Sequence, residues 1–162
     1  MRDGAQVDTG RRKFLEASGG ATLFGLLVAA GILKPGWAGA AEWNKSAFEA
    51  KSMKEALAAL GAGTPAEGKD IVVTAPDIAE NGAVVPITAT SNLPRTESIA
   101  FLVENNPNLL AASFLLSEGS VPVVSTRVKM ARTSNVSVLV KADGKFHVAT
   151  KEIKVTLGGC GG

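Results

Sequence analysis

Short β-rich runs separated by turn residues fill the chain from Lys69 onward, and this pattern restricts the fold more than any other feature of the sequence. Strands of this length at this spacing are typical of an all-β sandwich or barrel. The Asp143-Gly144 pair between two such runs is the strongest hairpin signal. We predict strands over residues 70–75, 84–91, 97–104, 112–117, 122–130, 135–142 and 145–157. The predicted breaks are Pro76, Asn81-Gly82, Asn92-Leu93-Pro94, Asn105-Asn106-Pro107, Glu118-Gly119 and Asp143-Gly144.

The predicted fold class is mainly β: an immunoglobulin-like antiparallel β-sandwich with a short N-terminal helical segment and a flexible C-terminal arm. The chain has a single cysteine, so the Cys-Trp-Cys pin of true immunoglobulin domains is absent and only the architecture is implied. A chain of this length buries enough apolar surface to be stable without disulfides.

Residues 44–61 have the pattern of an amphipathic helix, with Phe48, Ala56 and Leu60 on one stripe. Ser46 with Glu49 and Ser52 with Glu55 each have the spacing of a capping box. The pattern is therefore compatible with one helix or with two short ones.

Three predicted strands are apolar on both faces: residues 101–103, 114–116 and 136–140. A sandwich strand with one solvated face should alternate apolar and polar residues. We therefore expect the second face to be covered by the helical segment, by another protein, or by both.

The N-terminus has the features of a bacterial export signal. Arg11-Arg12 precede Phe14-Leu15, an apolar run covers residues 21–33, and an Ala-x-Ala site predicts cleavage after Ala40. The paired arginines resemble the twin-arginine signal, which predicts a periplasmic protein. The alternative, a membrane anchor, is disfavoured because the apolar run is shorter than the roughly 20 residues that span a bilayer. The predicted organisation is an export signal over 1–40, a helical segment over 41–66, a β-sandwich over 67–157 and a carrier arm over 158–162.

Charge and aromatic content argue against nucleic-acid binding. After residue 40 the basic and acidic residues are equal in number, so no basic patch is expected. Aromatic residues make up 5% of the chain, which is little for stacking single-stranded bases.

The sequence Gly158-Gly159-Cys160-Gly161-Gly162 follows the last predicted strand. A lone cysteine in an exported protein indicates intermolecular pairing or a reactive thiol. Glycine gives the backbone its highest freedom, so this segment is predicted to be a thin, mobile arm that presents a thiol. An alternative is a disordered tail with an incidental cysteine.

Catalysis by the thiol is not expected, because a catalytic cysteine needs a base or a positive field held beside it. The single histidine, His147, lies in a predicted strand, so no dyad with Cys160 is predicted. Met53 and Met130 do not complete a copper site with them, so no metal or cofactor is predicted. Asp77 and Glu80 are interpreted as turn residues.

Several segments of the chain resemble the SoxY family, the sulfur-carrying subunits of SoxYZ complexes. The arm with its cysteine is the most specific of them. The resembling segments are Ala75–Gly82, Val84–Pro86, Glu104–Pro107, Thr126–Ala131 and Val155–Gly162.

This resemblance implies a carrier rather than an enzyme. It implies that thiosulfate-derived intermediates are held covalently on Cys160, with no other cofactor, and that a SoxZ-like β-sandwich subunit forms a heterodimer that covers the apolar strand faces. The implied partner enzymes are a haem-containing SoxAX enzyme, the manganese hydrolase SoxB and, where present, a sulfane dehydrogenase.

Three other functions each fit part of the sequence. An exported interaction or chaperone-like sandwich would carry no covalent cargo. A ubiquitin-like sulfur carrier would activate the carboxylate of Gly162, but that chemistry is cytoplasmic. A thiol enzyme would turn over without partners.

Overall fold

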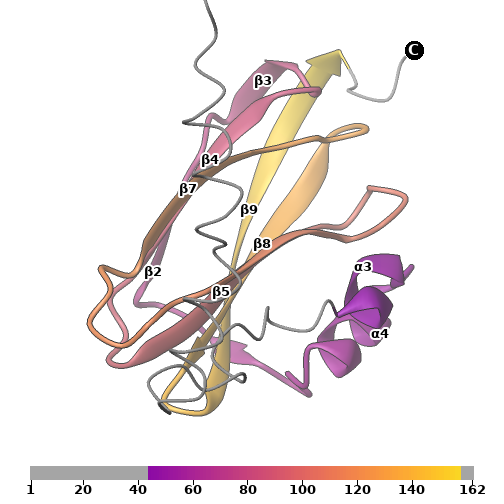
Figure 1. Cartoon of the computed structure of the whole chain (residues 1–162). Helices are drawn as coiled ribbons and strands as arrows, with labels where there is room; N and C mark the ends of the chain where they lie inside the picture. Colours follow the sequence, from indigo (N-terminus) through magenta and orange to yellow (C-terminus); the bar gives the residue numbers. More distant parts are fainter. Residues whose placement is uncertain (1–43, 158–162) are drawn as a thin grey trace, which may run out of the picture. The chain divides into compact units, whose positions relative to one another are not determined.

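A computed structural model describes residues 44–157 (Figure 1). The predicted export signal, with Arg11, Arg12 and the cleavage site after Ala40, and the predicted arm over 158–162 lie outside the described residues. The helices are α3 (Lys45–Glu49) and α4 (Met53–Ala59). The strands are β1 (Ala66–Glu67), β2 (Ile71–Thr74), β3 (Ile78–Asn81), β4 (Val85–Ser91), β5 (Thr96–Val103), β6 (Leu110–Leu115), β7 (Val123–Val128), β8 (Ser134–Ala142) and β9 (Lys145–Leu157).

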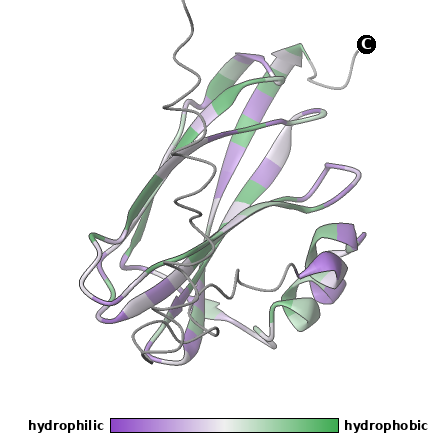
Figure 2. Ribbon diagram, in the orientation of Figure 1, coloured by the Kyte–Doolittle hydropathy of each residue, from purple (hydrophilic) through white to green (hydrophobic). Residues whose placement is uncertain are grey.

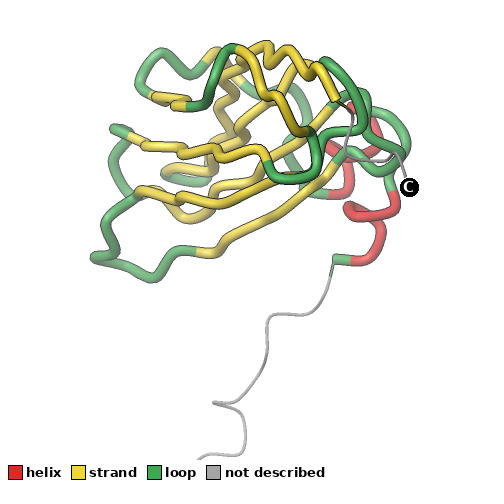
Figure 3. Tube along the Cα trace, turned by 90° about the horizontal axis from the view of Figure 1, so that it is seen from above, coloured by secondary structure: helices red, strands yellow, loops and turns green. Residues whose placement is uncertain are grey.

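The strands form two sheets that pack as a sandwich, which confirms the predicted mainly β fold class (Figure 3). The larger sheet has the order β1-β9-β8-β5-β6, with β3 also paired to β9, and the smaller sheet has the order β2-β4-β7. The long central pairings are antiparallel, whereas the short strands β1 and β3 join β9 in parallel. Parallel neighbours require a crossover connection, so these two pairings link β9 to distant parts of the sequence.

The last hairpin forms at the predicted position. Ala142 pairs with Lys145, and both turn residues have positive φ, 51° at Asp143 and 71° at Gly144. Two consecutive residues of positive φ are the requirement of a type I′ turn, which explains the Asp-Gly sequence.

The main core lies between the two sheets. Ile99, Phe101 and Val103 of β5 face it together with Val136, Val138 and Val140 of β8, and all six are fully buried. The rings of Phe101 and Phe114 meet edge to face, with centroids 6.2 Å apart. Because side chains alternate along a strand, the intervening residues of β5 and β8 point to the opposite face of the larger sheet.

The two helices cover that opposite face. Ala47, Ala50 and Ala56 form a second buried cluster with Leu102 and Leu139. The helical segment therefore explains why residues 101–103 and 136–140 are apolar on both faces. The expectation that a SoxZ-like partner covers these residues is wrong, since Leu102 and Leu139 are already buried within this chain. In the third run, by contrast, Leu115 on the edge strand β6 is 71% exposed.

The helical segment consists of two helices rather than one. Ser52 caps α4, accepting a hydrogen bond from the Glu55 amide at 3.2 Å, as the capping-box pattern predicts. The other predicted box is wrong, because Asn44 rather than Ser46 caps α3. The side chain of Asn44 accepts from the Ala47 amide at 3.1 Å, and Asn residues are among the best caps. Within the described chain, no helix combines the length and the apolar content needed to cross a membrane.

Truncation of Phe101 tests the position of the core. We expect Phe101→Ala to lower the free energy of unfolding by about 3–5 kcal/mol, because the lost ring leaves a cavity in the sandwich. Leu115→Ala on the exposed edge should change it by no more than about 0.5 kcal/mol. Chemical denaturation of both variants checks this, and equal losses would contradict the assigned core.

Candidate functional site

The end of β9 is the part of the described structure from which the predicted arm continues. Leu157 is the last residue of β9, and Cys160 follows it by three residues, outside the described residues. The predicted arm residues Gly158, Gly159, Gly161 and Gly162 also lie outside the described residues, and the end of β9 is the base to which they are attached.

β9 extends further than its neighbour β8. Their pairing ends with Ser134 opposite Ile153, so the last four residues of β9 lie beyond β8. On one edge three of these four residues pair with β3: Ile78 is opposite Lys154, Ala79 opposite Val155 and Asn81 opposite Leu157 (Figure 1). Strand ends are poorly ordered unless they are tied to a sheet, and β3 provides that tie.

Three further hydrogen bonds strengthen this edge. The Lys154 amide donates to the Asp77 carbonyl at 2.9 Å, and the Thr156 hydroxyl donates to the Glu80 carbonyl at 3.0 Å. The Gly82 amide donates to the carbonyl of Leu157 at 2.7 Å. The backbone is thus held up to the last described residue before the glycines.

The structure corrects the interpretation of Glu80, which lies within β3 rather than in a turn. Asp77 precedes β3, and its carboxylate lies 3.0 Å from the ammonium of Lys151 on β9. The same ammonium donates to the Ala75 carbonyl at 2.7 Å. These contacts fix the start of β3 against β9.

On the other edge of β9 a single side chain replaces the missing strand. The Thr133 hydroxyl accepts from the Val155 amide at 2.9 Å and lies 3.5 Å from the Val155 carbonyl. Sequence reasoning missed Thr133, because nothing in a polar loop distinguishes one threonine from another. The one signal in the sequence is that this loop follows the segment Thr126–Ala131, which resembles the SoxY family.

Exposed aliphatic side chains surround the base of the arm. Ile78, Val84 and Leu157 are 59%, 53% and 67% exposed. Figure 2 shows the hydrophobic colour at the tip of β9 and on the neighbouring β3–β4 connection. This end of the sandwich thus offers an apolar surface close to the point where the glycines begin.

His147 lies far from Leu157, the last described residue. It belongs to β9 opposite Val140, ten residues before Leu157, which corresponds to about 33 Å along the strand. Three residues beyond Leu157 span at most about 11 Å, so the geometry brings no Cys160–His147 dyad together.

Of the methionines considered as metal ligands, Met130 is fully buried and Met53 packs against the helical cluster. Among residues 44–157 no group of three or more acidic, His or Cys side chains is arranged to hold a metal ion.

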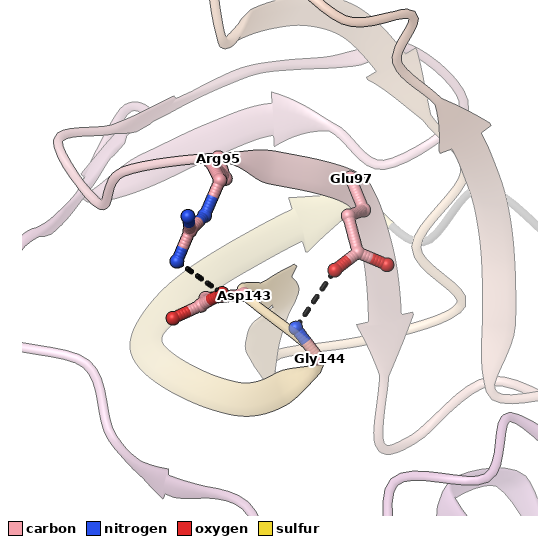
Figure 4. A network of polar contacts seen from close by, with 4 residues as sticks. All are labelled: Arg95, Glu97, Asp143 and Gly144. Atoms are coloured by element: carbon pink, nitrogen blue, oxygen red, sulfur yellow. Dashed lines mark hydrogen bonds and ion pairs between the residues drawn. The ribbon is translucent and has the colours of Figure 1, made fainter.

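A cleft of about 530 Å³ lies at the opposite end of β9. The hairpin residues Asp143 and Gly144 line it together with Leu93, Leu116 and Pro122. Arg95 pairs with Asp143, and the Glu97 carboxylate accepts from the Gly144 amide at 2.7 Å (Figure 4). β9 has 13 residues, so roughly 40 Å of strand separates this cleft from the base of the arm.

The pKa of the Glu97 carboxyl lies below its ordinary value of 4.5, because Lys141 donates a hydrogen bond to it and the Gly144 amide donates another. A lowered folded pKa means that Glu97 stabilises the hairpin above its unfolded pKa and loses this effect as the pH falls through the folded value. We expect Glu97→Gln to reduce the drop in unfolding temperature between about pH 5 and about pH 3.

Lys141→Met should reduce the same slope, and the double variant should add little, because both substitutions remove one interaction. Thermal unfolding followed across this pH range checks the expectation. A wild-type slope in Glu97→Gln would contradict the assigned role of the carboxylate.

Comparison with known proteins gives a matching family model and similar solved structures. A family model described as "Sulfur oxidation protein SoxY" matches residues 56–160, a region that begins in α4 and ends on Cys160. The solved structure of the sulfur carrier protein SoxY from Chlorobium limicola f thiosulfatophilum is 38% identical, with a TM-score of 0.60, and the match covers 70% of this chain and 100% of that chain.

A superoxide reductase (neelaredoxin) from Ignicoccus hospitalis is 15% identical, with a TM-score of 0.44, over 52% of this chain and 79% of that chain. No curated protein sequence matches this chain.

Proposed function

The chain belongs to the SoxY family of sulfur carriers, and on this premise we propose that it holds thiosulfate-derived sulfur covalently on Cys160. Family membership makes it a carrier in sulfur oxidation rather than an enzyme. The observation that supports Cys160 as the attachment point is the extent of the family match, which runs through the strand that precedes the glycines and ends on the cysteine.

The chemistry of loading follows from the thiol. The thiolate is the nucleophilic form of cysteine. Joining it to the outer sulfur of thiosulfate creates a sulfur–sulfur bond and releases two electrons, so the step needs an electron acceptor that this chain does not provide. A haem-containing SoxAX enzyme is the proposed acceptor, which is why the carrier requires a partner for loading.

Unloading then divides between two other proposed partners. Attack of water on the terminal sulfone gives sulfate and leaves a persulfide on Cys160, a hydrolysis assigned to the SoxB enzyme. A sulfane dehydrogenase, where present, oxidises the sulfur that remains. In both steps the chain contributes a thin, glycine-flanked attachment point, because glycines add no side chains beside the cargo.

The SoxY family implies a SoxZ partner, and we propose that the two chains form a heterodimer. Larger exposed apolar surfaces of a folded chain mark interaction sites. The candidates among the described residues include the row formed by Val72 of β2, Thr90 of β4 and Val123 of β7, which are register neighbours in the smaller sheet. Val72 and Val123 are 49% and 44% exposed. This row of the smaller sheet is therefore open to a partner, whereas the helices already cover the outer face of the larger sheet.

The proposed compartment is the periplasm. Support comes from the Arg11-Arg12 pair, the apolar run over 21–33 and the Ala-x-Ala site that ends at Ala40. The twin-arginine route carries folded proteins, so the sandwich is proposed to cross the membrane already folded.

Intact mass spectrometry tests the covalent cargo. Protein purified from cells supplied with thiosulfate should show added masses of a thiosulfonate group and of persulfide sulfur. Fragmentation should place them on the peptide that contains Cys160. A single unmodified mass under these conditions would favour an exported interaction or chaperone-like sandwich instead.

A further inference from the structure

The last four residues of β9 have a neighbouring strand on one edge only, because β8 does not reach them. β8 stops at Ser134, opposite Ile153, whereas β9 continues to Leu157. Neighbouring residues of a strand direct their backbone groups to opposite edges. The Lys154 amide donates toward β3, so the amide and carbonyl of Val155 point to the edge that β8 has left.

The Thr133 hydroxyl occupies this position. It accepts from the Val155 amide at 2.9 Å and lies 3.5 Å from the carbonyl of the same residue. One side chain thus meets both backbone groups that a further residue of β8 would have met. Thr133 itself is exposed, so its hydroxyl is not required by the core.

The loop that carries Thr133 is held by two asparagines. Asn105 donates to the Thr133 carbonyl at 2.8 Å. Asn106 accepts from the Ala131 amide at 2.9 Å and donates to the Lys129 carbonyl at 2.7 Å. The amide of fully buried Met130 donates to the Gly82 carbonyl at 2.7 Å, which joins this loop to the turn after β3.

These contacts bring together three segments that resemble the SoxY family and lie far apart in the sequence. Residues 75–82 supply β3 and its turn, residues 104–107 supply the two asparagines, and residues 126–131 lead into the loop of Thr133. All three converge on the final residues of β9.

We propose that this arrangement is an anchor that fixes the origin of the carrier arm, and that Thr133 is its positioning residue. The inference rests on the proposed function, in which Cys160 carries the cargo. With the anchor intact, Cys160 is attached within about 11 Å of a fixed Leu157. If β9 frays back to Ile153, seven residues replace three, and the tether lengthens to about 25 Å.

A longer tether lowers the effective concentration of the thiol at a partner's active site. Effective concentration falls roughly as the −3/2 power of tether length once the span is exceeded, so fraying to Ile153 predicts about a threefold to fourfold loss. The anchor therefore acts on delivery of the cargo and not on the reactivity of the sulfur.

The test compares Thr133→Val with Thr133→Ser in the full mature chain, bound to its partner subunit. Valine has the shape of threonine without the hydroxyl, whereas serine keeps the hydroxyl. Thr88→Val is a matched control, because it removes a hydroxyl that lies 2.9 Å from the Ser125 hydroxyl on the smaller sheet.

Hydrogen exchange reads the anchor directly. We expect the Val155 amide to exchange about five- to tenfold faster in Thr133→Val, as the loss of one hydrogen bond predicts, and at the wild-type rate in Thr133→Ser and Thr88→Val. Unfolding temperature and alkylation of Cys160 by iodoacetamide should be the same in all four proteins. An unchanged Val155 exchange rate in Thr133→Val would overturn the anchor.

Delivery is measured as sulfate release by the partner hydrolase from the loaded carrier. We expect Thr133→Val to release sulfate more slowly, by no more than the threefold to fourfold that complete fraying to Ile153 predicts, and Thr133→Ser to restore the rate. If exchange rises while release is unchanged, the anchor does not position the arm. If the wild-type chain takes up no sulfur at all, the proposed function fails, whereas the exchange result for the anchor stands independently.

Discussion

Replacing Cys160 by serine is expected to abolish sulfur loading completely. An alcohol is barely ionised at neutral pH and cannot form the sulfur–sulfur bond that holds the cargo, whereas the thiolate can. No other cysteine is present in the chain to replace it. Intact mass spectrometry after incubation with thiosulfate and the loading enzyme should show a single unmodified species for Cys160→Ser and added sulfur for the wild type.

The same substitution should leave folding unchanged. Cys160 follows the last strand of the sandwich, so we expect the free energy of unfolding to change by no more than about 0.5 kcal/mol. Wild-type protein alkylated on Cys160 with iodoacetamide is the chemical control and should resemble the serine variant. Sulfur adducts that persist in Cys160→Ser would show that the cargo is held elsewhere.

Loss of the two arginines should abolish export as completely as loss of Cys160 abolishes sulfur loading. We expect the double substitution Arg11→Lys with Arg12→Lys to leave the precursor in the cytoplasm, because the signal is read by a receptor that distinguishes the arginine pair from charge alone. Both substitutions keep the positive charge, so a charge-only requirement predicts normal export. Immunoblots of cytoplasmic and periplasmic fractions measure the outcome.

Arg2→Lys provides the control for this experiment, since it changes an arginine of the same segment outside the pair. N-terminal sequencing of the exported protein should begin at Ala41. Normal periplasmic yield from the double variant would refute the twin-arginine assignment while leaving the carrier chemistry untouched.

The sequence predicted the parts of the fold that depend on local patterns. Residues 145–157 were predicted as a strand and form β9 with the same bounds, because an Asp-Gly turn precedes a long run of strand-forming residues. β3 was missed, since Asp77, Glu80 and Asn81 have turn-forming character. What makes Ile78–Asn81 a strand is its pairing with β9, more than 70 residues away.

The site divides in the same way. The sequence predicted the lone thiol among glycines, because the chemistry follows from the residue types themselves. The anchor was not predicted, because Thr133, Asn105 and Val155 become neighbours only after β5, β8 and β9 have paired in the larger sheet. A hydroxyl that replaces a missing strand has no sequence pattern of its own.

The length of β9 also has a practical consequence for handling the protein. Its start and its end lie about 40 Å apart along one continuous strand. A dye, an affinity tag or a surface linkage placed in the exposed turn Ser117–Ser120, which borders the cleft at the start of β9, would therefore stand well away from the glycines. Immobilised in this orientation, the chain would present its thiol outward from a bead or sensor chip, and captured enzymes could be exchanged in flow without disturbing the attachment.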